Sequence, residues 1–248
     1  VREFVLLFSG VFLVVSNDTL FNKNLRATLL RHLGVKEDCV FNATSAETLH
    51  KELKLLRSKS HSVLIFVERE LNGRSTSDLI RYLNANPSSD VFVVALTAEV
   101  DRDKLVLLHE LGADNIITKP ISPDTLIEKI AFTVKPRGQL GDLMDKGKQL
   151  LDSGDALGAA KIAKQVLELK PQSPSGLLLM GDALRRMGKK EDALRAYSQA
   201  EKGARLFLDP LKKIAELHRE EGNTTEEIKI LERLDKLSPL NVDRKVDI

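Results

Sequence analysis

A fixed spacing organises the second half of this 248-residue sequence. Glycine recurs at intervals of 34 residues, at Gly154, Gly188 and Gly222. Small residues recur at the same interval, at Gly147, Gly181 and Ala215. Glycine permits the tight turn between two helices, and a small residue lets two helices pack closely. Strand-like runs are absent from this half of the sequence, so the spacing predicts three helical pairs between residues 140 and 241.

The first half has a different pattern, in which short β-branched runs alternate with amphipathic segments. The runs predict strands at residues 12–15, 39–42, 63–67, 91–96 and 115–118. The amphipathic segments predict helices near residues 20–32, 46–57, 78–84, 101–111 and 123–133. This alternation predicts an α/β fold, in which a parallel sheet is covered by helices on both faces. In such a sheet the functional residues lie beyond the carboxyl ends of the strands.

Polar side chains occur at those strand ends, at Ser16, Asn17, Asp18, Glu68, Thr97 and Lys119. Their order and spacing resemble the receiver domain of bacterial two-component response regulators, over about residues 11–134. The resemblance is closest in three stretches, Leu96-Thr97-Ala98, Gly112-Ala113-Asp114 and Thr118-Lys119-Pro120. It implies a flavodoxin-like, doubly wound parallel five-stranded sheet.

The resemblance places Glu68 at the phosphoacceptor position, where the family has Asp. Ser16 and Asn17 fall at the two acidic positions that hold the family's magnesium ion, and Asp18 lies one position later. Magnesium prefers anionic oxygens, and the glutamate carboxylate lies about 1 Å further out, a displacement that can cost about a hundredfold in rate. We therefore expect no metal, no cofactor and no enzymatic activity, with weak Mg²⁺ binding only if the domain is a conventional regulator.

Thr97 and Lys119 match the hydroxyl and the lysine that contact the family's phosphoryl group, and Ile116 occupies the aromatic switch position. We expect Glu68 to face Lys119 and Thr97 in a charge-assisted hydrogen bond. In one interpretation Glu68 imitates the phosphorylated group, draws Thr97 inward and keeps the domain active. In a second, the pair is a relic that satisfies its own charges and holds the loops. In a third, the pocket is still modified by an unconventional route.

The 34-residue helical pairs resemble the tetratricopeptide repeat, which implies an all-α superhelix whose concave face is built from the first helices. The implied groove positions are Met144, Lys148, Leu151, Leu178, Asp182, Arg185, Lys212, Glu216 and Arg219. This mixed set lacks the Lys/Asn clamp with which some relatives grip a carboxyl-terminal carboxylate. The third copy has Glu227 where the family has alanine, so we expect its last helix to shift by one residue and pack through Ile228.

These patterns predict a receiver-like domain over residues 1–137, a linker over 138–141 and three tetratricopeptide repeats over 142–248. Residues 1–10 precede the receiver resemblance, and an added strand, a swapped arm or an expression remnant are the alternatives for them. Residues 241–248 are too few for the polar helix that normally covers the last repeat. Truncation, a continuation in the natural protein or a dimer are the alternatives there.

Composition restricts the partners and the compartment. The chain has 38 Lys and Arg against 36 Asp and Glu, nearly balanced in both halves, which predicts no nucleic-acid partner. The single Cys39 cannot close an internal disulfide, which favours a reducing compartment and therefore the cytoplasm. The apolar stretch Phe4–Val15 is too short to cross a membrane and lacks a small-residue cleavage site, so we expect neither membrane insertion nor secretion.

Together these features predict a non-enzymatic bacterial signal-transduction adaptor, an atypical response regulator with a phosphorylation-independent receiver. A protein partner would bind in the tetratricopeptide groove. A histidine kinase, another receiver or a second copy of the chain would dock on the receiver surface around Ile116 and the last two helices of that domain. The alternative is a conventional two-component response regulator still controlled by phosphorylation in the receiver pocket. A nucleotide-binding or catalytic α/β domain is a third candidate, which a bound ligand would reveal.

Overall fold

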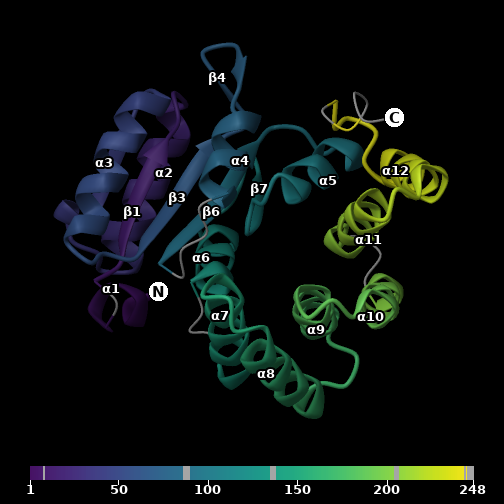
Figure 1. The fold of residues 1–248 in the computed structure, drawn as a ribbon. Helices are drawn as coiled ribbons and strands as arrows, with labels where there is room; N and C mark the ends of the chain where they lie inside the picture. Colours follow the sequence, from purple (N-terminus) through teal and green to yellow (C-terminus); the bar gives the residue numbers. More distant parts are fainter. Residues whose placement is uncertain (8, 86–89, 135–137, 204–206, 243, 245–248) are drawn as a thin grey trace. The chain divides into compact units, whose positions relative to one another are not determined.

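The computed structural model describes residues 1–7, 9–85, 90–134, 138–203, 207–242 and 244. The chain forms two compact units, Val1–Pro136 and Arg137–Ile248 (Figure 1). The first unit contains the sheet and the second is all helical. Within the described ranges, every helix falls short of the length and apolar character that a membrane crossing requires.

The segment between the units differs from the predicted linker. Helix α7 (Gln139–Asp152) begins with Gly138 as its N-cap residue, and the amides of Gly141 and Asp142 donate to the Gly138 carbonyl at 2.6 and 3.2 Å. Residues 139–141 are therefore the first turn of a helix, because their amides already take part in helical hydrogen bonding. Residues 135–137, and residues 243 and 245–248 of the predicted carboxyl-terminal tail, lie outside the described residues.

The sheet of the first unit has the five predicted strands. They are β1 (Val11–Val15), β2 (Val40–Ala43), β3 (Val63–Glu68), β6 (Val91–Thr97) and β7 (Asn115–Thr118). All are parallel and lie in the order β2-β1-β3-β6-β7 (Figure 1). This is the flavodoxin-like, doubly wound order, and the direction of winding reverses between β1 and β3. A crevice at the carboxyl ends of these two strands is the expected consequence.

Helices cover both faces of the sheet. Helices α2 (Thr19–Ala27) and α6 (Pro123–Thr133) pack on one face, and α3 (Ala46–Ser58), α4 (Ser77–Ala85) and α5 (Arg102–Glu110) pack on the other. The strands alternate accordingly: Phe12 and Val14 of β1 belong to the first core and Leu13 and Val15 to the second. A π-helical turn, Thr28–His32, continues α2, and a 3₁₀ turn, Glu37–Cys39, precedes β2. The hydrophobic periodicity therefore predicts this unit well.

The amino-terminal segment forms a short helix, α1 (Arg2–Leu7). Its Phe4 is buried and packs edge-on against Phe12 and Phe92, with ring centroids 5.8 and 6.2 Å apart. A Cβ at Gly10 would lie 2.4 Å from the Phe4 ring, so only glycine allows this approach. The segment is thus part of the core of its own unit rather than an added strand or a swapped arm.

A small hairpin that the sequence patterns did not predict follows β3. It consists of β4 (Glu70–Leu71) and β5 (Arg74–Ser75), paired antiparallel. Asn72 and Gly73 form its turn with φ of 53° and 74°. Two consecutive positive φ values are typical of the tight turn that an Asn-Gly dipeptide favours. The hairpin extends away from the sheet in Figure 1.

The second unit consists of helices joined in pairs by short turns. After α7 come α8 (Ala156–Leu169), α9 (Pro174–Arg186), α10 (Lys190–Gly203), α11 (Asp209–Glu220) and α12 (Thr224–Leu237). Gly154, Gly188 and Gly222 lie in the turns within the pairs, with φ of 87°, 74° and 70°. These backbone angles are strained for other residues, which explains the spacing of the three glycines.

Two small residues permit the close packing of these helices. A Cβ at Gly147 of α7 would lie 2.4 Å from Leu179 of α9. A Cβ at Gly181 of α9 would lie 2.3 Å from the ring of Tyr197 of α10, which is fully buried. Gly147 and Gly181 are 34 residues apart and occupy equivalent positions in their repeats. Each permits close contact between its own helix and a neighbouring helix.

The expected one-residue shift of the last helix does not occur. Glu227 is only 9% exposed and occupies the place that Ala193 and Ala159 occupy one and two intervals earlier. Its carboxylate accepts a hydrogen bond from Arg219 Nε at 2.5 Å. A buried carboxylate is tolerated where a cation compensates it, so α12 keeps the common register and Ile228 is not its buried contact.

Candidate functional site

The strands bring four predicted side chains to one edge of the sheet. β3 ends at Glu68 and β6 ends at Thr97, while Ser16 directly follows β1. The register pairs Thr97 with Thr118, the residue before Lys119. Because the strands are parallel, their carboxyl ends meet at this edge. The side chains of the predicted pocket therefore lie next to one another.

Lys119 is the centre of this pocket. Its Nζ donates to Glu68 Oε1 at 2.7 Å and to Asp18 Oδ2 at 2.8 Å. The side chains of Glu68 and Lys119 are 8% and 16% exposed. The ammonium also lies 5.7 Å from the centroid of the Phe21 ring. One ammonium thus bridges a buried carboxylate, Glu68, and a carboxylate that is 34% exposed, Asp18, through charge-assisted hydrogen bonds.

Ser16 and Asp18 are held in place by the start of α2. Ser16 Oγ donates to Glu68 Oε1 at 2.7 Å and accepts from the Asp18 amide at 3.1 Å. Asp18 is the N-cap residue of α2, and its Oδ1 accepts from the Phe21 amide at 2.9 Å. Asp18 therefore uses one oxygen for the helix cap and the other for Lys119.

The contacts of Lys119 stabilise the charged forms of the pocket. Its hydrogen bond is the main cause that holds the pKa of Asp18 below its usual range, and the Phe21 amide adds to the effect. Burial by itself lowers the pKa of Lys119, but the bonds to Asp18 and Glu68 outweigh burial and raise that pKa. Lys119 and Asp18 are therefore a stable ion pair at neutral pH.

These residues do not fit a magnesium ion. Ser16 and Asn17 offer a hydroxyl and an amide where magnesium prefers anionic oxygens. Asp18 is already engaged by the helix cap and by Lys119. A divalent cation near Glu68 would also meet the like charge of the ammonium. Across the described ranges, no group of three His, Cys, Asp or Glu side chains is arranged to hold a metal.

Thr97 and Ile116 lie differently from their expected roles. Thr97 is buried, and its hydroxyl accepts from the Glu99 amide at 3.1 Å. Among the described residues no hydrogen bond joins Thr97 to Glu68, so the predicted inward pull on Thr97 has no counterpart in the contacts. Ile116 is 7% exposed and packs in the core beneath α3, α4 and α5. The predicted docking surface cannot include its side chain, because that side chain faces the interior.

Three contacts beside the pocket were not predicted from the sequence. Asn17 Nδ2 donates to Asn72 Oδ1 in the hairpin turn at 3.2 Å. Arg69 forms an ion pair with Glu99 at 3.0 Å, and Glu99 also pairs with Lys104 at 2.5 Å. These contacts tie the hairpin and the loop after β6 to the rim of the pocket. The Asn-Gly dipeptide was the one available signal for the first of them.

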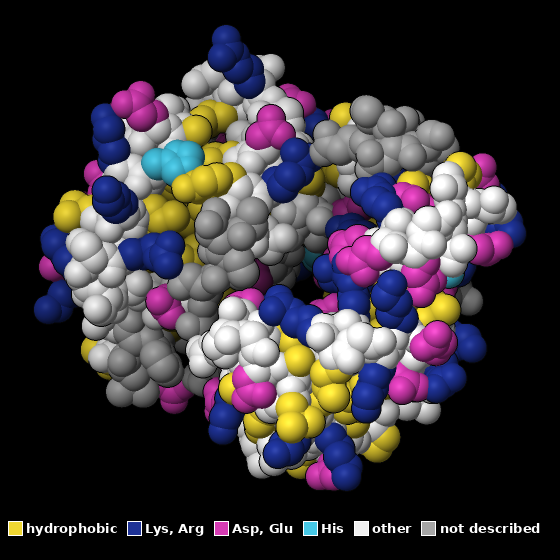
Figure 2. All heavy atoms as spheres, in the orientation of Figure 1, with side chains coloured by type: hydrophobic (Ala, Val, Ile, Leu, Met, Phe, Trp, Pro, Cys, Tyr) yellow, Lys and Arg dark blue, Asp and Glu magenta, His cyan; other side chains and the backbone are white. Residues whose placement is uncertain are grey.

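The helical unit has a second candidate site. A hollow of about 350 Å³ is lined by five predicted groove residues of α7 and α9, namely Met144, Lys148, Leu151, Leu178 and Asp182. Gly141, Asp145, Ser175, Leu179, Phe207 and Asp209 complete its wall. The wall is therefore partly apolar and partly charged. Figure 2 shows the same mixture of apolar side chains and charges of both signs over this unit.

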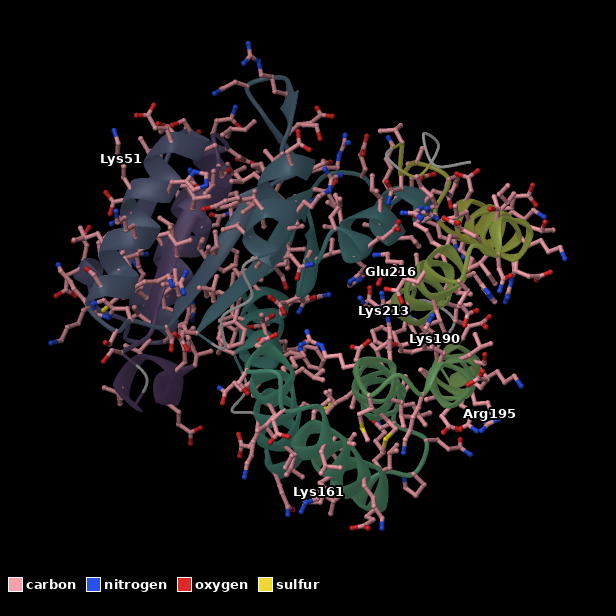
Figure 3. All side chains as sticks on the ribbon, in the orientation of Figure 1. Lys51, Lys161, Lys190, Arg195, Lys213 and Glu216 are labelled. Carbon is pink, nitrogen blue, oxygen red and sulfur yellow. The ribbon has the colours of Figure 1, made fainter. Side chains whose placement is uncertain are left out.

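Arg185, another predicted groove residue, joins α9 to α11 through ion pairs. Its guanidinium bonds Glu216 at 2.7 Å and also bonds Glu220. Lys213 pairs with Glu216 at 3.1 Å, and the two lie together on α11 in Figure 3. Arg185 is the main cause that lowers the pKa of Glu220; burial alone would raise the pKa of Glu216, but Arg185 and Lys213 lower it. The charges at this end satisfy one another.

The two remaining predicted groove cations also have partners within the unit. Lys212 pairs with Asp209 at 3.4 Å on the same helix. Arg219 bonds Glu227 at 2.5 Å and so connects α11 to α12. The predicted groove residues of α7 and α9 therefore line the hollow, apart from Arg185, whereas Arg185 and the predicted residues of α11 are engaged in ion pairs.

Comparison with known proteins identifies the first unit. Residues 12–131 match the family described as Response regulator receiver domain. The amino-terminal part of the chain is therefore a receiver domain of a response regulator, as found in two-component signalling. A two-component response regulator from Clostridium difficile is similar in structure, with a TM-score of 0.42 and 15% identity over 52% of this chain and 98% of that one.

The similar curated proteins are DNA-binding response regulators named MtrA. The one from Mycolicibacterium smegmatis is 29% identical over 156 residues, 62% of this chain and 61% of that protein. The one from Mycobacterium tuberculosis H37Rv is 32% identical over 118 residues, 48% of this chain and 47% of that protein. The chain thus spans about half to three fifths of the length of these relatives.

These names contradict one prediction from the sequence. The prediction that the chain has no nucleic-acid partner is wrong by this comparison, because the relatives are named as DNA-binding. Balanced net charge shows only that neither sign is in large excess, and a local basic patch is compatible with it. A regulator can be recruited to DNA without a large excess of Lys and Arg, so net charge was too weak a criterion.

Proposed function

We propose that the chain is a non-enzymatic signalling adaptor whose receiver domain works without phosphorylation. The observation that carries this proposal is the bridge in which Lys119 bonds Glu68 and Asp18 at 2.7 and 2.8 Å. Phosphoryl transfer to a carboxylate needs a divalent cation beside the nucleophile. Here an ammonium lies between the two carboxylates instead. The domain would therefore signal through surfaces whose shape does not depend on a transferred phosphate.

The contacts of Glu68 favour a stabilising role over imitation of a phosphoryl group. Ser16 and Lys119 donate to the same Glu68 oxygen, each at 2.7 Å. The Thr97 hydroxyl bonds the Glu99 amide at 3.1 Å rather than Glu68. The pair thus satisfies its own charges and holds the loops of the carboxyl edge. A histidine kinase, another receiver or a second copy would dock on the outer surface of these loops and helices.

The helical unit is, in this proposal, a tetratricopeptide array that recruits a protein. Its support is the 34-residue interval, the turn glycines with positive φ and the close contacts at Gly147 and Gly181. Arrays of helix pairs present an extended face to partners. The hollow on α7 and α9 would take a helix or an extended segment of the partner. Location in the cytoplasm belongs to the same proposal.

DNA binding is a second candidate function, which the names of the MtrA relatives favour. In those proteins the similarity covers about half of the length, so the activity is carried to this chain only as a proposal. Its test is fluorescence anisotropy of a labelled duplex with the full chain over a range of salt concentrations. Binding that weakens with salt would support it.

The decisive experiment on the receiver uses acetyl phosphate and Mg²⁺ with the full chain. Intact-mass spectrometry should show no added phosphoryl group, and NMR should show no saturable Mg²⁺ shift at Glu68 or Asp18. A control variant, S16D/N17D/E68D, restores the acids at the family's positions and should gain Mg²⁺ binding. Phosphoryl incorporation into the wild-type chain with saturable Mg²⁺ binding would support the conventional regulator and overturn the proposal.

A further inference from the structure

We propose that the hollow on α7 and α9 takes a segment of a protein partner that places a Lys or Arg side chain against Asp182 and an apolar residue beside it. This inference rests on the proposed function of the helical unit and adds the chemistry of its partner. It is carried by the contacts of Asp182, by the wall of the hollow and by the pairing of the charges around it.

Asp182 is a carboxylate that forms no direct ion pair within the described ranges, although Lys213 and Arg185 lie near enough to lower its pKa. Its Oδ1 accepts from the hydroxyl of Tyr197 at 2.8 Å, and the Tyr197 side chain is fully buried. Across the described residues, Asp182 has no ion-pair partner and its Oδ2 takes part in no hydrogen bond. Burial is the main cause that raises the pKa of Asp182 above its usual value. A partly desolvated anion of this kind is stabilised by a cation that arrives with its partner.

The surrounding wall has the composition that an amphipathic basic segment requires. Met144, Leu151, Leu178 and Leu179 supply apolar surface in the same hollow of about 350 Å³. The aliphatic part of a Lys or Arg side chain packs on such surface while its charged end reaches a carboxylate. A partner residue next to the cation would fill the apolar part.

The other acidic side chains in the wall of the hollow already have partners: Asp209 pairs with Lys212, and Asp145 takes part in a further interaction. Arg185 is held by Glu216 and Glu220, and Glu216 also pairs with Lys213. Lys148 of the hollow is exposed, so its charge is solvated and gains little from an acidic partner. An opposite charge on a partner should therefore stabilise the partly buried Asp182 carboxylate more than the exposed Lys148 ammonium. The net charge of the chain is +2, so general attraction of cations does not produce the same preference.

The test uses three pools of short, amidated peptides with randomised apolar positions and one central residue, which is Arg, Gln or Glu. Each pool is titrated into the full chain and followed by NMR of the amides of α7 and α9. We expect saturable shifts with the Arg pool. In the variant Asp182→Asn, which keeps an acceptor for Tyr197, the affinity for that pool should fall about tenfold, which is about 1.4 kcal/mol.

The control variant is Asp192→Asn, because Asp192 pairs with Arg195 on the outer side of α10, where Figure 3 labels Arg195. It should bind the Arg pool like the wild-type chain. If the Gln or Glu pool binds as tightly as the Arg pool, or if Asp182→Asn binds the Arg pool as tightly as the wild-type chain does, the preference for a cation is overturned. In that case the hollow is still a peptide-binding site. Absence of shifts with all three pools overturns both the preference and the proposed peptide groove. The phosphorylation-independent receiver is tested separately by the acetyl phosphate experiment.

Discussion

Glu68 and Lys119 form an ion pair of 2.7 Å across the carboxyl edge of the sheet, between the end of β3 and the residue after β7. A second carboxylate, that of Asp18, bonds the same ammonium from the start of α2. Three segments that are distant in the sequence are thereby joined through one nitrogen. The pocket thus has the form of a structural clasp, because each charge in it already has a partner.

Loss of the Glu68 charge should destabilise the receiver. In the variant Glu68→Gln, Lys119 keeps Asp18 but loses its more buried partner. Breaking a fully buried pair costs about 3–5 kcal/mol, and the remaining partner reduces the expected cost to about 1–3 kcal/mol. Urea unfolding of the full chain, followed by a probe in the first unit, measures it.

The matched control for that variant is Glu47→Gln. Glu47 pairs with Lys51 on the exposed side of α3, where Figure 3 labels Lys51, and both side chains are more than 70% exposed. Exposed pairs contribute about 0–1 kcal/mol, so this variant should unfold close to the wild-type midpoint. Equal effects of the two substitutions would show that Glu68 and Lys119 are not a structural clasp.

The stability of the receiver should fall in acid partly because of Asp18. Lys119 lowers the pKa of Asp18 in the folded state, so the unfolded chain binds its proton more readily. The contribution of Asp18 to the stability of the receiver is fully present above its unfolded pKa of about 4. It is lost as the pH falls through the lower pKa that Asp18 has in the folded state. In Asp18→Asn, which can still cap α2, the acid slope should be less steep by up to about 1.4 kcal/mol per pH unit.

Denaturant unfolding between neutral pH and acid measures this slope. The control is Asp78→Asn, because the Asp78 side chain is 94% exposed and pairs with Arg81 on α4. It should leave the acid slope of the wild-type chain nearly unchanged. An identical slope for Asp18→Asn and the wild type would contradict the assignment of Lys119 as the cause.

The sequence predicts the elements of the receiver because their periods are strong. All five residues of β1 are buried and alternate between the two cores, and apolar residues recur on the inner faces of α2 and α3. The β4–β5 hairpin was missed because its strands are two residues each, too short for any period. The helix α1 was missed because its six residues are too few for a helical period to be recognised.

The sequence predicted which residues line the receiver pocket, but it predicted fewer of the hydrogen bonds that they form. Strand order places Glu68 and Lys119 at one edge, and both were expected to meet. The role of Asp18 as the second partner of Lys119 depends on the direction of a capping side chain, which strand periodicity does not specify. The burial of Glu227 was mispredicted for a related reason, since its compensation by Arg219 comes from a neighbouring helix.

Close helix contact at Gly181 should be sensitive to a single methyl group. In Gly181→Ala, the new Cβ would lie 2.3 Å from the Tyr197 ring, which is fully buried and cannot move freely. Overpacking of this kind costs about 1–3 kcal/mol, which exceeds the helix-propensity gain of about 1 kcal/mol. Thermal unfolding of the helical unit measures the result. The control, Gln149→Ala on the exposed side of α7, should change stability by less than about 0.5 kcal/mol.

Removal of either partner in the pair of Arg219 and Glu227 should give unequal effects. Glu227 is 12% exposed in its side chain, whereas Arg219 is 54% exposed. In Arg219→Ala the buried Glu227 carboxylate loses the hydrogen bond from α11, and the substitution should cost about 1–3 kcal/mol of stability. In Glu227→Ala the helix regains the residue type that Ala159 and Ala193 supply at the equivalent positions. That variant should stay within about 1 kcal/mol of the wild type.

The two single variants and the double variant, compared by urea unfolding, separate the pair from its parts. The double variant should resemble Glu227→Ala, because no buried charge remains to be compensated once the carboxylate is gone. Equal destabilisation by the two single substitutions would mean that Glu227 is already well solvated. A double variant that is much less stable than Glu227→Ala would mean that Arg219 stabilises the unit through other contacts than this bond.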